Sequence, residues 1–391
     1  IVERVIKSML WVVGGYKIYL AGSHTLYQKI KAAYQDKGLR DFDYHFMSGV
    51  YEHDFEVEEA TFDTLPAVKE SSVPAGGHLE GNRIGFDAGG SDRKVSAVVD
   101  GKTIYSEEVV WFPKTNEDPK YHYDGIYTAM KTAAEKMGNK IDAIGVSSAG
   151  VYIDNKIMVA SLFVKVPKDL FEKHVKYMYI DIAKQLEKEV GHPIPLEVAN
   201  DGDVTALAGA MELKDTNVLG IAMGTSEAAG YVDSNGNLTG WLNELAFVPV
   251  DFNKDAMVDE WSLDYGCGVK YFSQDSVIKL APAANIELDP SLSPAEKLKV
   301  VQKLSEQDDP RAHQIYETIG VYLGYAIAYY SVFYSIKHIL LLGRVTSGKG
   351  GNIILKKAKE VLENEFPEYA SIHLTMPDET NRRVGQSIAA A

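Results

Sequence analysis

Residues 85–101 read GFDAGGSDRKVSAVVDG, and residues 220–236 read GIAMGTSEAAGYVDSNG. In each stretch an apolar run is followed by a turn of small residues, a second apolar run and another tight turn, which is the pattern of a β-hairpin. One such hairpin is common, but two of the same form in one chain indicate a duplicated domain. We therefore expect two related halves that face one another.

From Arg83 onward, strand-like and helix-like segments alternate along the chain. Short apolar runs bounded by turn residues predict strands, and amphipathic stretches that end near glycine predict helices. This alternation is typical of an α/β fold whose sheets are covered by helices. The expected strands are 84–87, 95–99, 141–147, 196–199 and 339–342, and the expected helices are 127–137, 174–190 and one that begins near Val204.

The first 82 residues predict a separate N-terminal α/β extension. Residues 16–21 (YKIYLA) alternate like a strand, residues 26–34 continue with helical spacing, and residues 71–81 (SSVPAGGHLEG) have the composition of a linker. This stretch contains 8 Lys and Arg residues against 12 Asp and Glu residues. A DNA-reading domain is normally basic and rich in helices, so we expect no such domain here, and the role of the extension stays open.

Composition narrows the class of protein. The chain has 391 residues and a formal charge of −15, with 46% apolar and 24% charged residues, which is typical of a soluble protein of two or three domains. An acidic surface repels phosphate backbones and anionic lipid, so neither nucleic acid nor a membrane is an expected partner. The only cysteine, Cys267, allows neither an intrachain disulfide nor a zinc site built from several cysteines, and we expect a cytoplasmic protein.

The first hairpin turn carries the residue types of a phosphate-binding loop. Asp87 stands at a strand end and is followed by Gly89, Gly90 and Ser91. Glycines let main-chain N–H groups approach an anion, and the aspartate could hold Mg²⁺ through water. The alternative is a plain hairpin turn that needs glycine for its backbone.

The second turn, Gly224, Thr225 and Ser226, offers the same donors without the carboxylate. Two donor-rich loops together favour a clamp on a polyphosphate. Near the C-terminus the strand 339–342 runs into Gly343 and a glycine-rich passage, which suits nucleotide binding but is not a Walker loop.

Residues 197–203 (EVANDGD) run from a strand into a helix. Asn200 and Asp201 stand at the carboxyl end of the strand, where α/β proteins place ligands. An aspartate there could accept the proton of a hydroxyl that attacks phosphorus. An N-cap is the alternative for Asp203 and, less favoured, for Asp201.

Residues 145–150 (GVSSAG) form another strand with a small-residue exit. Ser148 and Gly150 could let a polyol lie close to the backbone, or they could form a tight turn between a strand and a helix. Both readings stay open.

Taken together, residues 83–391 resemble the ROK family of sugar kinases and regulators, within the actin-like ATPase superfamily. The resemblance rests on the order and spacing of five motifs. They are the first phosphate motif at 87–91, the sugar-binding asparagine and catalytic aspartate at Asn200 and Asp201, the second phosphate motif at 224–226, the adenosine region that opens at Gly343, and a last helix at 383–389.

The resemblance implies two ribonuclease H-like domains around a cleft. The small domain is expected at 83–199 with a C-terminal helix at 378–391, and the large domain at 200–377. Asp201 would be the catalytic base, Glu244 a sugar ligand, Mg-ATP the phosphoryl donor and a small sugar the acceptor. A homodimer is also expected on this basis alone.

The chain departs from the family pattern at four positions. Phe247 stands where the family has a histidine that binds sugar and zinc, and Cys267 is the remnant of a cysteine-rich zinc loop, so zinc is expected to be absent. Val269 replaces a second sugar-binding glutamate. Asp92 stands where a lysine is common.

These departures leave three hypotheses for the function. The first is an ATP-dependent kinase for a hexose or related polyol. The second is a catalytically weak sugar-binding or sensing protein on the same fold. The third is a kinase for an acylated amino sugar or an acid, in which Phe247 alters the pocket.

Overall fold

The computed structural model describes residues 1–69, 72–73 and 80–377, and the chain divides into two compact units. Unit 1 contains residues 1–73, 216–235 and 239–377, and unit 2 contains residues 74–215 and 236–238 together with the C-terminal stretch from 378. The predicted helix at 378–391 and most of the predicted linker lie outside the described residues. The domain boundaries expected from the sequence stay a prediction.

Unit 2 is an α/β unit with one main sheet. Its strands are β4 (Asn82–Ala88), β5 (Asp92–Val99), β6 (Lys102–Val110), β7 (Ala143–Ser148), β8 (Val151–Ile153), β9 (Lys156–Val159) and β10 (Leu196–Asn200), and its helices are α4 (Pro119–Lys136), α5 (Lys168–Leu170), α6 (Met178–Val190) and α7 (Asp201–Leu213). The main sheet has the order β10-β7-β4-β5-β6.

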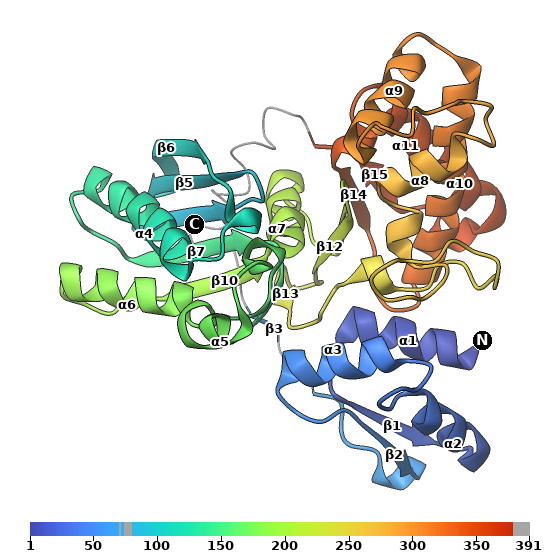
Figure 1. The fold of residues 1–391 in the computed structure, drawn as a ribbon, viewed down its shortest axis with the longest axis horizontal. Coiled ribbons are helices and arrows are strands. Elements are labelled where there is room, and N and C mark those ends of the chain that lie inside the picture. Colours follow the sequence, from blue (N-terminus) through green and yellow to red (C-terminus); the bar gives the residue numbers. More distant parts are fainter. Residues whose placement is uncertain (70–71, 74–79, 378–391) are drawn as a thin grey trace. The chain divides into compact units, whose positions relative to one another are not determined.

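The pairing in this sheet explains where its strands end. β4 and β5 are antiparallel, with Ile84 opposite Ala97, which confirms the first predicted hairpin. β7 pairs in parallel with both β4 and β10, so three strands finish at the same edge. α4 and α6 lie side by side (Figure 1), and Ile126 and Ile182 reach from them into the core of this unit.

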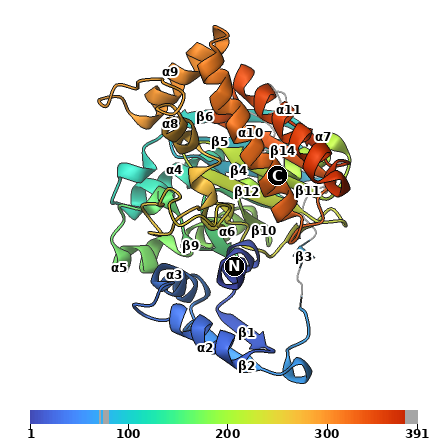
Figure 2. The same ribbon diagram turned by 90° about the vertical axis from the view of Figure 1, so that its right-hand side faces the viewer.

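The larger part of unit 1 is a second α/β body. Its strands are β3 (Ser72–Val73), β11 (Val218–Met223), β12 (Glu227–Val232), β13 (Leu238–Thr239), β14 (His338–Leu342) and β15 (His373–Thr375), and its helices are α8 (Gln274–Leu280), α9 (Pro294–Glu306), α10 (Pro310–Tyr330) and α11 (Lys349–Glu365). The sheet has the order β15-β14-β11-β12-β13-β3. β11 and β12 are antiparallel, with Gly220 opposite Gly230, so the second predicted hairpin is confirmed. Figure 2 shows α10 and α11 running side by side.

The N-terminal residues form a small α/β layer within unit 1. Its elements are α1 (Val2–Val13), β1 (Lys17–Ala21), α2 (His24–Ala33), α3 (Asp41–Tyr51) and β2 (Glu56–Ala60). β1 and α2 confirm the strand and helix predicted here, and β1 pairs in parallel with β2. Trp11 and Met47 are fully buried and belong to the same core cluster as Phe247, so this layer shares its core with the rest of unit 1.

Three predicted helix starts were wrong. α4 begins at Pro119 rather than 127, because Asp118 caps it by accepting from the Lys120 N–H at 2.9 Å. The predicted start of α6 at 174 falls in a wider π turn, Phe171–Val175, and the regular helix begins at Met178. α7 begins at Asp201 rather than near Val204, since the Asn200 side chain accepts from the Gly202 N–H at 2.7 Å.

Across residues 1–69, 72–73 and 80–377, none of the helices has both the length and the apolar character that crossing a bilayer requires.

Candidate active site

The carboxyl ends of three parallel strands gather the candidate residues of unit 2. In the register of the sheet, Ala88 of β4 lies opposite Ser148 of β7, which in turn lies opposite Asn200 of β10. Asp87 directly precedes Ala88, and Asp201 directly follows Asn200. Both aspartates therefore lie at this edge of the sheet. The sheet brings together candidates that are more than one hundred residues apart in sequence.

Asp87 is a buried carboxyl with one cation nearby. Its exposed fraction is 7%, and the Lys94 Nζ lies 3.8 Å from Oδ2. Burial raises the pKa of Asp87, and the negative charges of Asp92 and Glu108 add to this rise, whereas Lys94 opposes it. A carboxyl in this state gains from a positive ion placed beside it.

Asp201 is the first residue of α7 and is partly exposed. Its pKa is raised to about 6: burial and the charge of Asp87 raise the pKa, whereas hydrogen bonds from backbone N–H groups and the Lys114 charge lower it. A base with a pKa of about 6 is ionised at neutral pH and still basic enough to take a proton.

The turn after β4 is held by a tryptophan. The Trp111 Nε1–H donates to the Gly89 carbonyl oxygen at 2.7 Å, and the Trp111 N–H donates to the Ser91 carbonyl oxygen at 3.1 Å. The Ser91 hydroxyl donates to Asp92 at 3.1 Å. The backbone of this turn is thus fixed from one side.

Lys114 lies against the same turn. It belongs to a short 3₁₀ helix, Pro113–Thr115, that follows Trp111. A methyl group placed on Gly90 would sit 2.9 Å from its Cε and 3.1 Å from its Nζ. Glycine at this position therefore leaves room for a lysine that carries positive charge to the turn and to Asp201.

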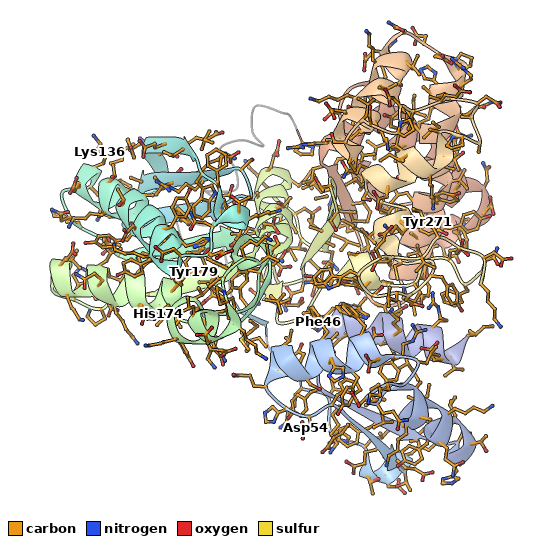
Figure 3. All side chains as sticks on the ribbon, in the orientation of Figure 1. Phe46, Asp54, Lys136, His174, Tyr179 and Tyr271 are labelled. Carbon is orange, nitrogen blue, oxygen red and sulfur yellow. The ribbon has the colours of Figure 1, made fainter. Side chains whose placement is uncertain are left out.

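The predicted sugar-binding positions make contacts within unit 2. Asn200 donates from Nδ2 to the Gly150 carbonyl oxygen at 2.7 Å. Gly150 has φ +143, and a side chain there would collide with the Val159 carbonyl oxygen. The Ser148 hydroxyl accepts from the Tyr179 hydroxyl at 3.3 Å, and Figure 3 labels Tyr179 on α6. The backbone conformation and the close approach of Val159 are therefore enough to require glycine at position 150, without a bound ligand.

The second phosphate turn lies in unit 1, between β11 and β12. The Gly224 N–H donates to the Ser226 carbonyl oxygen at 2.9 Å, and the Gly224 carbonyl oxygen accepts from the Gln274 N–H at 2.9 Å. Thr225 and Ser226 are exposed. Gly343 has φ +105, and a side chain there would collide with the Met223 carbonyl oxygen. The turn, the start of α8 and Gly343 thus form one packed group.

An apolar groove of about 730 Å³ lies further along α8 in unit 1. Its walls come from α8, from the loop that follows and from the start of α9. The lining residues are Ile278, Pro282, Asn285, Ile286, Glu287, Leu288, Pro290 and Lys297. Its size and apolar walls suit a flat heterocyclic ring.

In unit 1, Glu244 directly precedes a single 3₁₀ turn, Leu245–Phe247, and Phe247 is the last residue of that turn. Glu244 is partly exposed, whereas Phe247 is 5% exposed and packs on Trp11 with ring centroids 4.4 Å apart. Behind Glu244 lies Glu227, a buried carboxyl with no hydrogen-bond partner on either oxygen. Burial, reinforced by the charge of Glu244, holds the pKa of Glu227 well above its usual range.

Two sets of groups bear on metal binding. Asp87 and Asp201 are close enough for one charge to raise the pKa of the other, and Mg²⁺ commonly binds one or two carboxylates together with water and phosphates, so these residues fit that ion. In the described part of the chain, Asp36, Asp41 and His45 place three ligand atoms within 4.8 Å of one another on the N-terminal layer. The expected absence of zinc stays a prediction.

The model of the ROK family matches residues 83–386. The chain belongs to the ROK family. No curated protein matched the chain by sequence.

Solved ROK structures share the fold at low identity. The ROK hexokinase of Thermus thermophilus has a TM-score of 0.59 at 16% identity over 79% of this chain and 97% of that one. The ROK glucokinase of Streptomyces griseus, solved with glucose and AMPPNP, has a TM-score of 0.56 at 18% identity over 80% and 98%. A ROK transcriptional regulator, a homolog of the E. coli MLC protein, has a TM-score of 0.58 at 15% identity over 80% and 78%. The predicted family and α/β fold are confirmed.

The sequence pointed to the two glycine turns and to Asp201, but it missed two charged groups. Lys114 comes 23 residues after Ser91, the last residue of the first turn, and it belongs to no recognisable sequence motif. Only the fold brings it close to Gly90. Glu227 directly follows the predicted second phosphate turn, and a glutamate at the start of a strand was visible in the sequence. The roles of the site residues in binding and catalysis stay predictions.

Proposed function

We propose that this ROK protein transfers the γ-phosphoryl group of ATP to a hydroxyl of a hexose or related sugar. The observation that carries the proposal is Asp201, whose pKa of about 6 suits a general base and which starts a helix at the carboxyl edge of the sheet. Asp87 and Lys114 are close enough to change the pKa of Asp201. Asp87 supplies a negative charge that suits a metal ion, and Lys114 supplies a positive charge that suits phosphate.

In the proposed reaction the sugar hydroxyl oxygen bonds to the γ-phosphorus, and the bond from that phosphorus to the β,γ-bridging oxygen breaks. The hydroxyl proton passes to a carboxylate oxygen of Asp201, and ADP leaves with the bridging oxygen. Mg²⁺, when bound near Asp87, supplies positive charge that offsets the phosphate charge.

The other residues bind and orient the two substrates. The N–H groups of the Gly89–Ser91 turn and of Thr225 and Ser226 hold phosphate oxygens, and Lys114 adds a cation at the first turn. Gly343 shapes the approach to the nucleotide, and the groove beside α8 receives the base. Asn200, Ser148 and Glu244 hold sugar hydroxyls.

Replacement of the base tests this proposal. Asp201→Asn keeps the shape of the side chain but cannot accept the proton, so we expect turnover with Mg-ATP across a sugar panel to fall at least about a hundredfold. Asp203→Asn, two residues along the same helix, is the matched control and should keep most of the activity. If Asp201→Asn retained full ATP-dependent sugar phosphorylation, the assignment would be wrong.

A sugar sensor with weak catalysis is the second candidate. Phe247 and Val269, which replace a histidine and a glutamate of the resemblance, are 5% and 9% exposed and belong to the core cluster of unit 1. These positions offer no polar atom to a sugar. This candidate predicts sugar binding without turnover, and a kinase for an acylated amino sugar or an acid predicts turnover on those acceptors and none on glucose.

A further inference from the structure

The last turn of α1 is hydrogen-bonded to the segment that carries Glu244. Three consecutive N–H groups, from residues 242–244, donate to three consecutive carbonyl oxygens, from residues 11–13. The pairs are Leu242 with Val13 at 3.3 Å, Asn243 with Val12 at 3.0 Å and Glu244 with Trp11 at 3.0 Å. The final carbonyls of a helix have no partner within the helix, so this segment satisfies the end of α1 and is itself held in one register.

Aromatic packing extends the same contact to the residues that follow Glu244. Trp11 lies on Phe247 with ring centroids 4.4 Å apart, and Phe42 of α3 lies 5.4 Å from Phe247. Trp261 also packs on Phe247, with ring centroids 5.3 Å apart. Aromatic pairs at these spacings add stability beyond burial, so both ends of the 3₁₀ turn after Glu244 are fixed by the N-terminal layer.

Charge anchors the other end of α1 to the same loop. Arg4 and Lys7 each approach Asp264 to 2.6 Å, and Arg40 approaches it to 2.8 Å. All four side chains are 7% exposed or less. The loop between Glu244 and Asp264 is therefore attached to α1 at both of its ends.

We infer that the N-terminal helix α1 is a positioning element of the sugar site, because it sets the place of Glu244. The inference rests on the proposed function, in which Glu244 binds the acceptor. It assigns a role in substrate recognition to residues outside the stretch 83–386 that the ROK model matches. The N-terminal layer thus acts on the acceptor and not on the nucleotide.

Two adjacent glycines at the end of α1 provide a matched test. Gly14 has φ +86 and Gly15 has φ +119, so alanine strains the backbone at both positions. An alanine at Gly14 would collide with the Tyr51 hydroxyl and lie 3.3 Å from the Leu242 Cβ, whereas one at Gly15 would meet nothing within 4 Å. Only Gly14→Ala therefore pushes on the segment that carries Glu244.

The expected result is a change in acceptor binding alone. Gly14→Ala should raise the KM for the sugar about tenfold, which corresponds to about 1.4 kcal/mol, with the KM for Mg-ATP and kcat nearly unchanged. Gly15→Ala should keep the wild-type sugar KM. Adding Tyr51→Phe to Gly14→Ala removes the closest collision and should restore part of the sugar affinity.

Several outcomes would overturn the inference. They are equal sugar KM values for the two glycine variants, or a loss in Gly14→Ala that falls equally on sugar and Mg-ATP. Calorimetric sugar affinities of both variants provide the same comparison without turnover, so a wild-type protein that binds sugar but does not phosphorylate it defeats the proposed kinase and leaves this test intact. A wild-type protein that binds no sugar defeats both.

Discussion

Lys114 shows how one side chain can alter the electrostatics of the first phosphate turn. Asp92 stands where a lysine is common in the ROK pattern, and a carboxylate there would repel phosphate. The Lys94 Nζ lies 3.4 Å from Asp92. Lys114 comes from a different element and packs on Gly90, where it also lowers the pKa of Asp201. We infer that it replaces the missing charge of the turn.

Lys114→Met tests this replacement. The variant loses the cation but keeps most of the side-chain length, so we expect the KM for Mg-ATP to rise on the order of tenfold, since a charged hydrogen bond contributes about 1.5–3 kcal/mol. The acid limb of the kcat/KM profile should also move to higher pH, because the cation no longer favours ionised Asp201. Lys120→Met, an exposed lysine that pairs with Asp124, is the control, and equal effects in the two variants would contradict the assignment.

The raised pKa of Asp201 also predicts how stability depends on pH. Its folded-state value of about 6 exceeds the ordinary 3.8, so the folded protein binds the proton more tightly, and ionisation destabilises it as pH rises from about 4 through 6. Asp201→Asn should therefore unfold at a higher temperature than the wild type at pH 8 and at a similar temperature near pH 4, with a gain of up to about 3 kcal/mol at pH 8. Wild-type turnover should rise through pH 6 and level off above it. A stability difference that does not change with pH would contradict this account.

At the scale of single residues, the sequence predicts those positions that depend only on local backbone geometry. The glycines of both turns and the strand-end position of Asp201 follow from periodicity and turn chemistry. The start of α7 was misplaced by three residues because Asn200, Asp201 and Asp203 are all possible N-caps by type, and only the backbone shows that Asn200 holds the Gly202 N–H. Lys114 could not be predicted, because its approach to Gly90 depends on how the chain returns after β6.

At the scale of elements, α1 is a helix that the sequence did not predict. Its buried face includes Arg4, Lys7, Ser8 and Trp11, which follow helical spacing but are mostly polar. Charged residues are rarely buried unless they are paired, and their partner Asp264 is more than 250 residues away. The pairing, and with it the helix, becomes visible only when the loop that carries Asp264 is in place.

Asp264→Asn tests how strongly this network holds α1. Burial by itself would raise the pKa of Asp264, but Lys7, Arg40 and Arg4 outweigh it and lower the value to about 2. The carboxylate therefore stabilises the fold fully above about pH 4, and this contribution is lost as pH falls towards 2. Removing its charge takes away the carboxylate that three buried cations share, although Lys7 still lies 3.6 Å from Asp43 and Arg40 still pairs with Glu3. We therefore expect a loss of about 3 kcal/mol in the free energy of unfolding at pH 7.

Chemical denaturation with a matched variant measures this loss. Asp308→Asn breaks an exposed ion pair with Lys349 and should change stability little. The Asp264 variant should also expose the N-terminal layer to protease before the rest of unit 1. If both variants unfolded at the same denaturant concentration, the buried charges around Asp264 would contribute no more to stability than an exposed ion pair, which would contradict the prediction.

At the scale of the whole molecule, the two halves of the ATPase fold carry different parts of the proposed chemistry. Unit 2 contains the proposed base Asp201 and the predicted first phosphate turn, whereas unit 1 contains the predicted second turn, the groove beside α8 and Glu244. The duplication could be predicted from the two hairpins, because each hairpin is a local pattern. The attachment of residues 1–73 to unit 1 could not, since it depends on buried contacts across long sequence separations.

Ligand-induced stabilisation separates a kinase from a sugar sensor. A ligand that binds the folded state raises its stability by about 2.7 kcal/mol at one hundred times its Kd. For a kinase we expect Mg-ATP or the non-hydrolysable Mg-AMPPNP to raise the melting temperature without sugar, and an acceptor sugar to raise it further. Lys114→Met should weaken the response to the nucleotide and keep the response to the sugar, whereas Gly14→Ala should do the reverse. Stabilisation by sugars with no response to either nucleotide would exclude the kinase and favour a sugar sensor on the ROK fold.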